Sequence, residues 1–395
     1  MERIWHCQGM TSVSARVPAR QQSIRASNLA LAYRLVLDAP TPVSRAALAA
    51  ATGMTRATAG ALADALLAAG LVEEVAPPPA STAGRPATGL VPASAGWVGL
   101  GLEVNVDHLA ACVVDLTGAV RHEVTLDGDQ RGRKPGPVLA DLAELANRVT
   151  EDLAAPSSPE AGPGTGLRIA GAAVAVPGLV RANGGRVLRA PNLGWQDVDV
   201  LAELTPRLPE TPALAAVGNE ADYAALAELA ADRGLRDFLY VSGEIGVGAG
   251  IVFDRRLFTG SRGWAGEIGH VTVEPGGDAC RCGARGCLET VAGLDALRAP
   301  APDAASRAGR GLGRAIAAAV NLYDLDTVVL GGAYAQRADL EEFVRAALTE
   351  HVVSARWAPV AVRRSRLGGT AAAVGAATSV VHRIHADPAA WEARD

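Results

Sequence analysis

Four side chains of the kinds that bind metal ions lie close together in the 395-residue sequence. They are His270, Cys280, Cys282 and Cys287. Three thiolates and one imidazole make a closed tetrahedral zinc site, and Gly283 and Gly286 would let the backbone fold around the ion. The chain has five cysteines, an odd number, and three of them lie within eight positions, a clustering that favours a metal over a disulfide framework. We therefore predict a structural zinc site; the alternative is three reduced cysteines in a loop and a surface histidine.

The composition limits the class of protein. Apolar residues make up 49% of the chain and charged residues 20%, which excludes disorder for most of a length that suits two or three domains. The longest apolar stretch, 169–180, is broken by Pro177 and Gly178, so no membrane helix is predicted. The first 25 residues lack the apolar segment of a signal peptide. We expect a soluble cytoplasmic protein.

The elements that begin the chain follow a pattern typical of DNA-binding units. A helix is predicted to end near Asp38, Ser44 can cap a second, Gly53 forms a turn, and Thr55 can cap a third. A short strand-like stretch follows at 71–75. The first 95 residues carry a net charge of +3, against −8 for the remainder, which favours nucleic-acid contact by this part. The pattern predicts a winged helix-turn-helix.

The rest of the sequence alternates strands and helices, which predicts an α/β body with two lobes. Strand patterns at 97–102, 109–114 and 169–176 precede a helix at 221–231, and strands and helices continue to alternate to about residue 330. The expected divisions are a flexible start (1–23), the winged helix-turn-helix (24–79), a wing or linker (80–95), a first lobe (96–213), and a second lobe containing the zinc motif (214–395).

The zinc motif and several short runs together resemble the ROK family of repressors, open reading frames and sugar kinases. The residues that carry the resemblance are Gly266-Glu267-Ile268-Gly269-His270 with the cysteine motif, and the runs 176–180, 190–195, 219–221, 246–250 and 330–332. The resemblance implies two ribonuclease-H-like lobes with a sugar in the cleft between them. It also implies the front DNA-binding domain of the family's repressor branch.

The resemblance further implies a set of sugar-binding residues. They are Asn219, Glu220, Glu267, His270 and Glu289, with Gly178 and Asn192 expected from the opposite lobe. Carboxylates and amides suit this task because they grip a ring of hydroxyls through charge-assisted hydrogen bonds. His270 would bind zinc through one ring nitrogen and face the sugar with the other.

The departures of this chain from the motifs of the family's kinases argue against phosphotransfer. The family's kinases place an Asp after the Asn as the general base, where this chain has Glu220, which displaces the carboxylate by about 1.5 Å. The family's first phosphate loop reads Asp-Ile-Gly-Gly-Thr, whereas residues 103–107 read Glu-Val-Asn-Val-Asp. The second loop has Glu244 between Gly243 and Ile245. Carboxylates at both loops oppose a triphosphate, so we predict that the protein is not an enzyme.

Contacts with DNA are expected from the third helix and the segment after it. Thr55, Arg56 and Thr58 stand near the helix start, where such helices meet base edges and phosphates, and Arg45 could hold the backbone. Gly84-Arg85-Pro86 resembles the core of an AT-hook, which would slide Arg85 into a narrow minor groove; the alternative is a plain linker turn.

These expectations combine into one leading function and two alternatives. The leading one is a sugar-responsive transcriptional repressor that binds operator DNA as a homodimer or homotetramer and a monosaccharide as effector, with no membrane partner. One alternative is an ATP-dependent sugar kinase that retains a DNA-binding domain. The other is a zinc-dependent interaction protein that binds no sugar. The sequence identifies neither the sugar nor the sign of the response.

Overall fold

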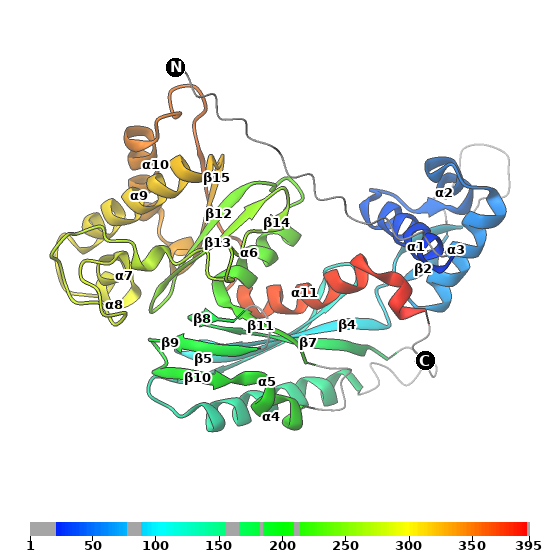
Figure 1. Ribbon diagram of the computed structural model, residues 1–395, viewed down its shortest axis with the longest axis horizontal. Coiled ribbons are helices and arrows are strands. Elements are labelled where there is room, and N and C mark those ends of the chain that lie inside the picture. The colour runs from blue at the N-terminus through cyan, green and yellow to red at the C-terminus, as the bar shows by residue number, and fades with distance from the viewer. Residues whose placement is uncertain (1–20, 77–87, 155–165, 182–184, 209–213, 393–395) are drawn as a thin grey trace, which may run out of the picture.

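A computed structural model of the 395-residue chain describes residues 21–76, 88–154, 166–181, 185–208 and 214–392 (Figure 1). The N-terminal unit holds three helices and a three-stranded antiparallel sheet of order β1-β3-β2. The helices are α1 (Gln21–Asp38), α2 (Arg45–Thr52) and α3 (Arg56–Ala68), and the strands are β1 (Val43–Ser44), β2 (Val72–Val75) and β3 (Gly89–Pro92).

Local capping explains why α2 and α3 begin where they do. The Ser44 hydroxyl accepts a hydrogen bond from the Ala47 amide, and the Thr55 hydroxyl accepts one from the Thr58 amide, as N-caps do. Gly53 ends α2 with a φ of +70°, a left-handed conformation that glycine adopts without strain. Ala59, Leu62 and Leu66 are buried along one side of α3. The two caps and the turn at Gly53 agree with the sequence prediction.

One part of the segment expected to be a wing or linker forms a strand. Gly89–Pro92 forms β3, which pairs with both β1 and β2 and buries Leu90. The four residues begin with Gly and end with Pro, so they carry little strand signal, and partners on both sides supply the hydrogen bonds that define the strand. Arg85 lies outside the described residues.

Two five-stranded sheets form the body and share one topology. In each, a three-stranded antiparallel meander is followed by two strands that add in parallel beside its first strand. The first sheet holds β4 (Trp97–Val104), β5 (His108–Asp115), β6 (Val120–Asp127), β7 (Arg168–Val176) and β11 (Leu214–Asn219). The second holds β12 (Phe238–Gly243), β13 (Val247–Phe253), β14 (Arg256–Leu257), β15 (Thr327–Gly332) and β16 (Ala361–Arg364).

A third, smaller sheet and the remaining helices complete the body. A third sheet contains β8 (Leu179–Val180), β9 (Arg186–Ala190) and β10 (Trp195–Asp199). The remaining helices are α4 (Pro135–Ala154), α5 (Val200–Leu204), α6 (Glu220–Ala231), α7 (Leu288–Ala292), α8 (Leu294–Leu297), α9 (Ala304–Tyr323), α10 (Ala338–His351) and α11 (Ala371–Ala386). Short 3₁₀ turns are η1 (Thr205–Arg207), η2 (Ile268–His270), η3 (Ala333–Gln336) and η4 (Pro388–Trp391). No helix among the described residues is both long and apolar enough to cross a bilayer.

The C-terminal helix α11 returns to the first sheet and packs against α6 (Figure 1). The approach to β4 is close because a Cβ atom added at Gly101 would lie 1.9 Å from the Ala373 carbonyl oxygen. The first sheet also takes β11, which lies past the lobe boundary expected at residue 213. The first sheet therefore takes a strand from beyond the expected boundary. Strand β11 pairs in parallel with β7, which lies some forty residues earlier, and no local sequence pattern indicates this pairing.

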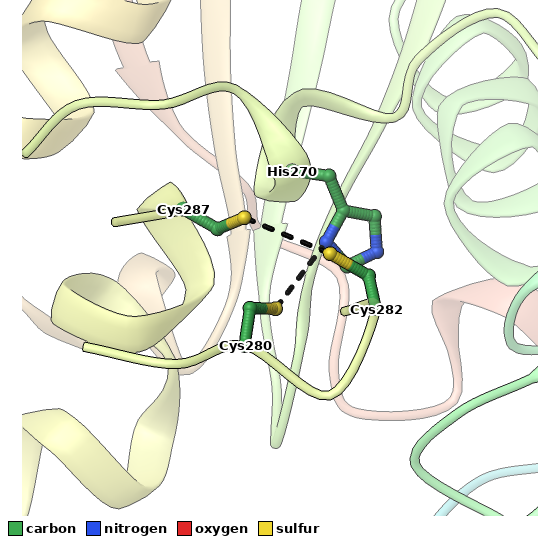
Figure 2. Close-up of side chains that lie close together, drawn as sticks. All are labelled: His270, Cys280, Cys282 and Cys287. Carbon is green, nitrogen blue, oxygen red and sulfur yellow. Dashed lines mark hydrogen bonds between the residues drawn. The ribbon is translucent and has the colours of Figure 1, made fainter. Parts of the chain in front are cut away.

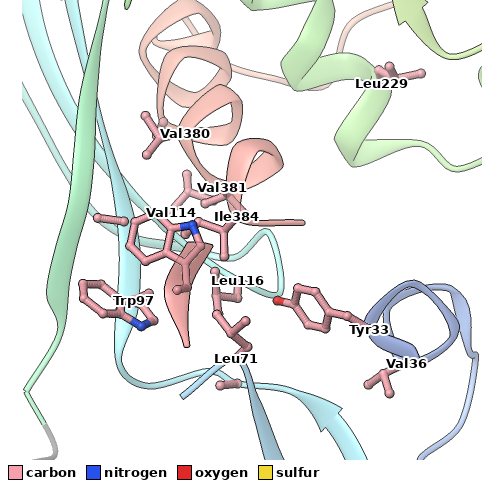
Figure 3. Close-up of a cluster of buried hydrophobic side chains, with 14 of the residues drawn as sticks. Tyr33, Val36, Leu71, Trp97, Val114, Leu116, Leu229, Val380, Val381 and Ile384 are labelled. Atoms are coloured by element: carbon pink, nitrogen blue, oxygen red, sulfur yellow. The ribbon is translucent and has the colours of Figure 1, made fainter. Parts of the chain in front are cut away.

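A continuous apolar core joins the N-terminal unit to the body. It includes Tyr33 of α1, Leu71, Trp97 at the start of β4, and Ile384 of α11 (Figure 3). The Trp97 indole nitrogen donates a hydrogen bond of 2.9 Å to the Ala69 carbonyl at the end of α3. Movement of the N-terminal unit relative to the body therefore disturbs buried apolar contacts.

This junction is expected to make stability depend on pH. His385 contacts the Tyr33 ring edge to face, and its Nε2 lies 3.2 Å from the Leu116 carbonyl oxygen. Burial, with the nearby His382, lowers the pKa of His385 to about 4. The unfolded chain takes up this proton below a pH of about 6.5, and the folded chain does not, so stability falls as the pH drops from 6.5 to 4, by at most about 1.4 kcal/mol per unit.

Thermal or denaturant unfolding at pH 7 and pH 5 tests this expectation. A His385→Gln variant should lose less stability over that interval than the parent chain does. His351→Gln, at an exposed position of α10, is the matched control and should keep the parent's pH dependence. An identical pH dependence in all three proteins would rule out the contribution of His385.

Candidate functional site

The four predicted metal ligands come together at one place on the second lobe (Figure 2). Their ligand atoms all lie within 4.8 Å of one another. The Cys280 sulfur is 3.7 Å from His270 Nδ1, and the Cys282 and Cys287 sulfurs are 3.7 Å apart. Four ligands at about 2.3 Å from a tetrahedral ion would be separated by about 3.8 Å. The donor set therefore fits a metal ion.

The loop that carries the cysteines folds tightly through its glycines. Gly286 has a φ of +72°, and a Cβ atom there would lie 1.7 Å from the Glu274 carbonyl oxygen. The Val273 and Glu274 amides both donate to the Gly286 carbonyl oxygen. Arg307 of α9 holds Glu274 through two guanidinium hydrogen bonds. These contacts bring the cysteine turn back onto η2, where His270 is the last residue.

A partly open cavity of about 60 Å³ lies next to this cluster. All seven side chains or backbones expected at a sugar site line it: Gly178, Asn192, Asn219, Glu220, Glu267, His270 and Glu289. They come from the ends of β7, β9 and β11 on one side and from η2 and α7 on the other.

Asn219 and Glu220 are fixed by the start of α6. The Asn219 side-chain oxygen accepts hydrogen bonds from the Ala221 and Asp222 amides, so Asn219 is the N-cap of the helix. Its amide nitrogen donates to the Gly178 carbonyl oxygen at 3.2 Å and to Glu220 Oε2 at 2.9 Å. Asn219 therefore orients the Glu220 carboxylate in addition to lining the cavity.

On the opposite side, Glu289 links the cavity to the metal cluster. Its Oε2 accepts hydrogen bonds from Asn192 Nδ2 at 3.5 Å and from the Val247 amide at 3.4 Å, and its Oε1 is 3.9 Å from the Cys280 sulfur. The two ring nitrogens of His270 have different neighbours: Nδ1 is 3.7 Å from the Cys280 sulfur, and Nε2 is 3.9 Å from Glu267 Oε2. A metal ion bound through Nδ1 would fix the direction of Nε2.

Burial and mutual repulsion shape the electrostatics of the cavity. Burial raises the pKa of Glu220 well above its usual range, and the charges of Glu267 and Glu103 add to the effect. Burial likewise raises the pKa of Glu267, with Glu289 contributing. Burial, together with Glu103 and Asp107, raises the pKa of Glu244 to about 7. Each of these carboxyl groups is therefore harder to ionise than one exposed to solvent.

Hydrogen bonds hold residues 103–107, the segment that the sequence analysis compared with a phosphate loop, in place. Glu103 is 1% exposed; its Oε1 accepts from Asn105 Nδ2 at 3.0 Å, and its Oε2 accepts from the Ala373 amide in the first turn of α11 at 3.1 Å. Burial opposes charge on His108, yet hydrogen bonds to Asp107 and Glu103 outweigh it and raise the pKa of His108 to about 10. The sequence did not indicate His108, because this residue belongs to no recognisable motif.

The N-terminal unit exposes most of the residues expected at DNA. Thr55, Arg56 and Thr58 are all exposed at the start of α3, and the two threonine hydroxyls are 2.9 Å apart. The Arg45 guanidinium instead bonds Asp64 at 2.7 Å and also Glu74. Arg45 would have to leave these carboxylates to contact a phosphate.

Comparisons with known proteins support the likeness seen in the sequence. The family model described as ROK family matches residues 100–305 and 298–383. A protein named xylose repressor from Caldicellulosiruptor bescii is 32% identical over 272 residues, which are 68% of this chain and 64% of that protein. The transcriptional dual regulator NagC of Escherichia coli strain K12 is 28% identical over 346 residues, covering 78% of this chain and 81% of NagC.

A comparison with solved structures finds a match that covers more of the chain. A crystal structure of a ROK family transcriptional regulator, described as a homologue of the Escherichia coli MLC protein, covers 92% of this chain and 97% of its own, with a TM-score of 0.73 and 26% identity. The match to the Caldicellulosiruptor bescii xylose repressor spans less than two thirds of that protein's length. With the family model matching more than half of the residues, the chain belongs to the ROK family.

Proposed function

We propose that the protein is a sugar-responsive transcriptional repressor that binds operator DNA through its N-terminal unit and a monosaccharide in the cavity between its lobes. The observation that carries this proposal is that the seven residues expected to bind a sugar line one cavity beside four possible metal ligands. The N-terminal unit of the same chain contains three helices, two of them capped by hydroxyl side chains. Relatives named as repressors of xylose and N-acetylglucosamine systems support the same assignment.

The metal in this proposal is a structural Zn²⁺ held by His270, Cys280, Cys282 and Cys287. Three thiolates and an imidazole are the donor set that zinc favours, and all four positions are taken by protein. Zinc would supply no reaction here; the ligand residues would hold the loop and keep the His270 ring directed at the cavity. The body around it would be the pair of ribonuclease-H-like lobes implied by the shared topology of the two sheets.

The proposed DNA-binding unit is a winged helix-turn-helix at residues 24–79, with α3 as the helix that enters the major groove. The hairpin of β2 and β3 would form the wing, with Arg85 in the segment between them. A homodimer or homotetramer would place two such units on a palindromic operator. Sugar binding would change lobe closure and shift DNA affinity by about 1 to 3 kcal/mol, typical of allosteric coupling.

Replacing Arg56 by Ala is expected to weaken operator binding by about tenfold or more, because an exposed arginine at the start of α3 contacts bases or phosphates. The measurement is fluorescence anisotropy with DNA selected by the parent protein from a randomised library. Arg45→Ala is the comparison variant: with its guanidinium bound to Asp64 and Glu74, it should lose less affinity. Equal affinity of Arg56→Ala and the parent would remove α3 from the proposed interface.

The proposed binding of a sugar effector can be tested separately from DNA binding. Binding of xylose, glucose or N-acetylglucosamine to the zinc-loaded chain should raise its melting temperature and release the selected DNA. A Glu267→Ala variant should lose both responses, because it removes a carboxylate that lines the cavity beside His270. No thermal shift with any monosaccharide, together with tight DNA binding, would favour an interaction protein that binds no sugar.

The kinase alternative has less support in the site. The Glu103 carboxylate of β4 accepts a hydrogen bond from the Ala373 amide in the first turn of α11, and Glu244 lines the cavity. A nucleotide triphosphate would therefore meet carboxylates. A coupled assay of ATP consumption with the same sugars distinguishes the two functions. Turnover above about 1 per second, ordinary for kinases, would replace the repressor assignment by an enzymatic one.

A further inference from the structure

A second cavity, here called the junction cavity, lies where the N-terminal unit meets the body. Its volume is about 1030 Å³, it is open to solvent, and it shares no lining residue with the proposed sugar site. The N-terminal unit contributes the end of α1 and parts of β2 and β3, and the body contributes β5, the end of α6, β14 and α11. Figure 3 shows two of the lining side chains, Leu116 and Val381. A ligand in this cavity would contact both units.

The charged residues that line the junction cavity are mainly cationic. Four arginines line it, against two carboxylates, and two histidines of α11 line it as well. These residues are Arg34, Arg233, Arg255 and Arg256, the acids Asp38 and Glu73, and His382 and His385. Within the part of the chain that the structure describes, none of the four arginines forms an ion pair with a carboxylate. The cavity therefore holds positive charge that the chain itself does not pair.

One of these cations is held by a backbone conformation that favours glycine. Asp254 and Arg255, the two residues between β13 and β14, have φ angles of +47° and +58°. Two-residue hairpin turns of this kind usually have Gly at the second position, because a side chain there is strained. The Arg255 guanidinium donates to three carbonyl oxygens around the end of α6, those of Leu229, Arg233 and Leu235. These bonds fix its positive charge at the wall of the cavity and leave that charge without a carboxylate partner.

The remaining arginines come from both sides of the junction. The Arg233 guanidinium donates to the Leu37 carbonyl oxygen at 3.2 Å, in the last turn of α1. Arg34 lies three residues before Leu37 and therefore on the same side of that helix. Arg34 and Arg256 are exposed, and among the described residues neither has a hydrogen bond or an ion pair. One guanidinium from each unit is thus available to a ligand in the junction cavity.

We propose that the junction cavity binds a small metabolite with two anionic groups, at least one of them a phosphate, and that this ligand holds the N-terminal unit against the body. Guanidinium groups suit a phosphate because their N–H bonds form paired, charge-assisted hydrogen bonds with its oxygens. Two anionic groups allow one molecule to contact Arg34 of α1 and Arg256 of β14 together. The ligand would act beside the sugar effector, at a separate site, and its binding does not depend on which sugar fills the other cavity.

Calorimetric titration of the full chain with fructose 1,6-bisphosphate, 3-phosphoglycerate and succinate tests the proposal. We expect at least one of the two phosphate compounds to bind at one site per chain, and succinate, which lacks phosphate, to bind more weakly than that compound. Arg34→Gln and Arg256→Gln should each weaken the binding by about tenfold, because each removes one guanidinium from the site. Arg148→Gln, at an exposed position of α4, is the matched control and should bind as the parent chain does.

Hydrogen exchange measures the second part of the proposal. The bound compound should slow exchange of the amides in the last turns of α1, because it links Arg34 to the body, and Arg256→Gln should remove this protection. Unchanged exchange in α1 with the compound bound would show that the ligand does not hold the two units together.

Three further results would overturn the proposal and leave the sugar-responsive repressor standing. The first is that neither phosphate compound binds, or that both arginine variants bind it as tightly as the parent. The second is that binding is lost in Glu267→Ala, which would place the compound in the sugar cavity instead. The third is that Arg34→Gln and Arg256→Gln lose DNA affinity while none of the three compounds binds, which would assign these arginines to the DNA backbone.

Discussion

A Cys287→Ser variant is expected to lose its zinc, to melt about 10 °C lower than the parent, and to bind its effector more than tenfold more weakly. Cys287 is fully buried at the N-cap of α7, and its sulfur lies 3.7 Å from that of Cys282. Losing one of four ligands removes most of the binding free energy of a structural zinc, and that energy also stabilises the loop. The effector loses affinity because His270 and Glu289 line the cavity and contact the cluster.

Elemental analysis for zinc, a melting curve and a sugar titration measure the three effects on one preparation. Cys112→Ala is the matched control: Cys112 is also fully buried, but it lies in β5 of the first sheet, far from the other cysteines in sequence. The control should keep one zinc per chain and its sugar affinity. A Cys287→Ser protein that retains both would show that the cluster holds no structural metal.

The features that the sequence predicted well are those encoded locally. Ser44 and Thr55 cap their helices because a hydroxyl needs to reach only three residues along the chain. The cysteine turn was recognisable because three of its four ligands fall within eight residues. Buried strands such as β7 were recognisable in the sequence as short apolar runs.

The features that were missed depend on distant partners. Glu103 reads in sequence as an acid in a degenerate phosphate loop, and its hydrogen bond to the Ala373 amide joins residues 270 positions apart. Helix α11 is rich in alanine and contains Gly375, so its burial between α6 and the first sheet leaves little amphipathic pattern. The sequence analysis also did not predict that Asn219 caps α6, because it assigned this residue only to sugar binding.

A Trp97→Ala variant is expected to separate DNA binding from the sugar response. Trp97 begins β4 and is 5% exposed; its ring packs edge to face on Trp391 at 4.8 Å, and Arg168 lies 4.1 Å above the ring. Truncating a buried tryptophan costs about 3 to 5 kcal/mol. The lost contacts are those between the body and the C-terminal end of α3, where the indole donates to the Ala69 carbonyl.

Strand β4 explains why this loss should affect coupling in particular. It runs from Trp97 to Val104 and is followed by Asn105, which lines the cavity, so one rigid strand of about 26 Å connects the effector site to the end of the proposed reading helix. A change of lobe closure that moves β4 would move α3 through this contact. Without the indole, the N-terminal unit keeps its own core of Leu48, Leu62 and Leu66 and can still bind DNA.

The measurement is DNA affinity with and without saturating sugar. The parent should change its affinity on adding sugar, and Trp97→Ala should bind DNA with an affinity within about tenfold of the parent but respond to sugar by less than twofold. Trp357→Ala is the matched control, because this tryptophan is 82% exposed and removing it should leave the response intact. A full sugar response in Trp97→Ala would mean that the signal reaches α3 through other contacts of the junction, such as those of Tyr33 with His385.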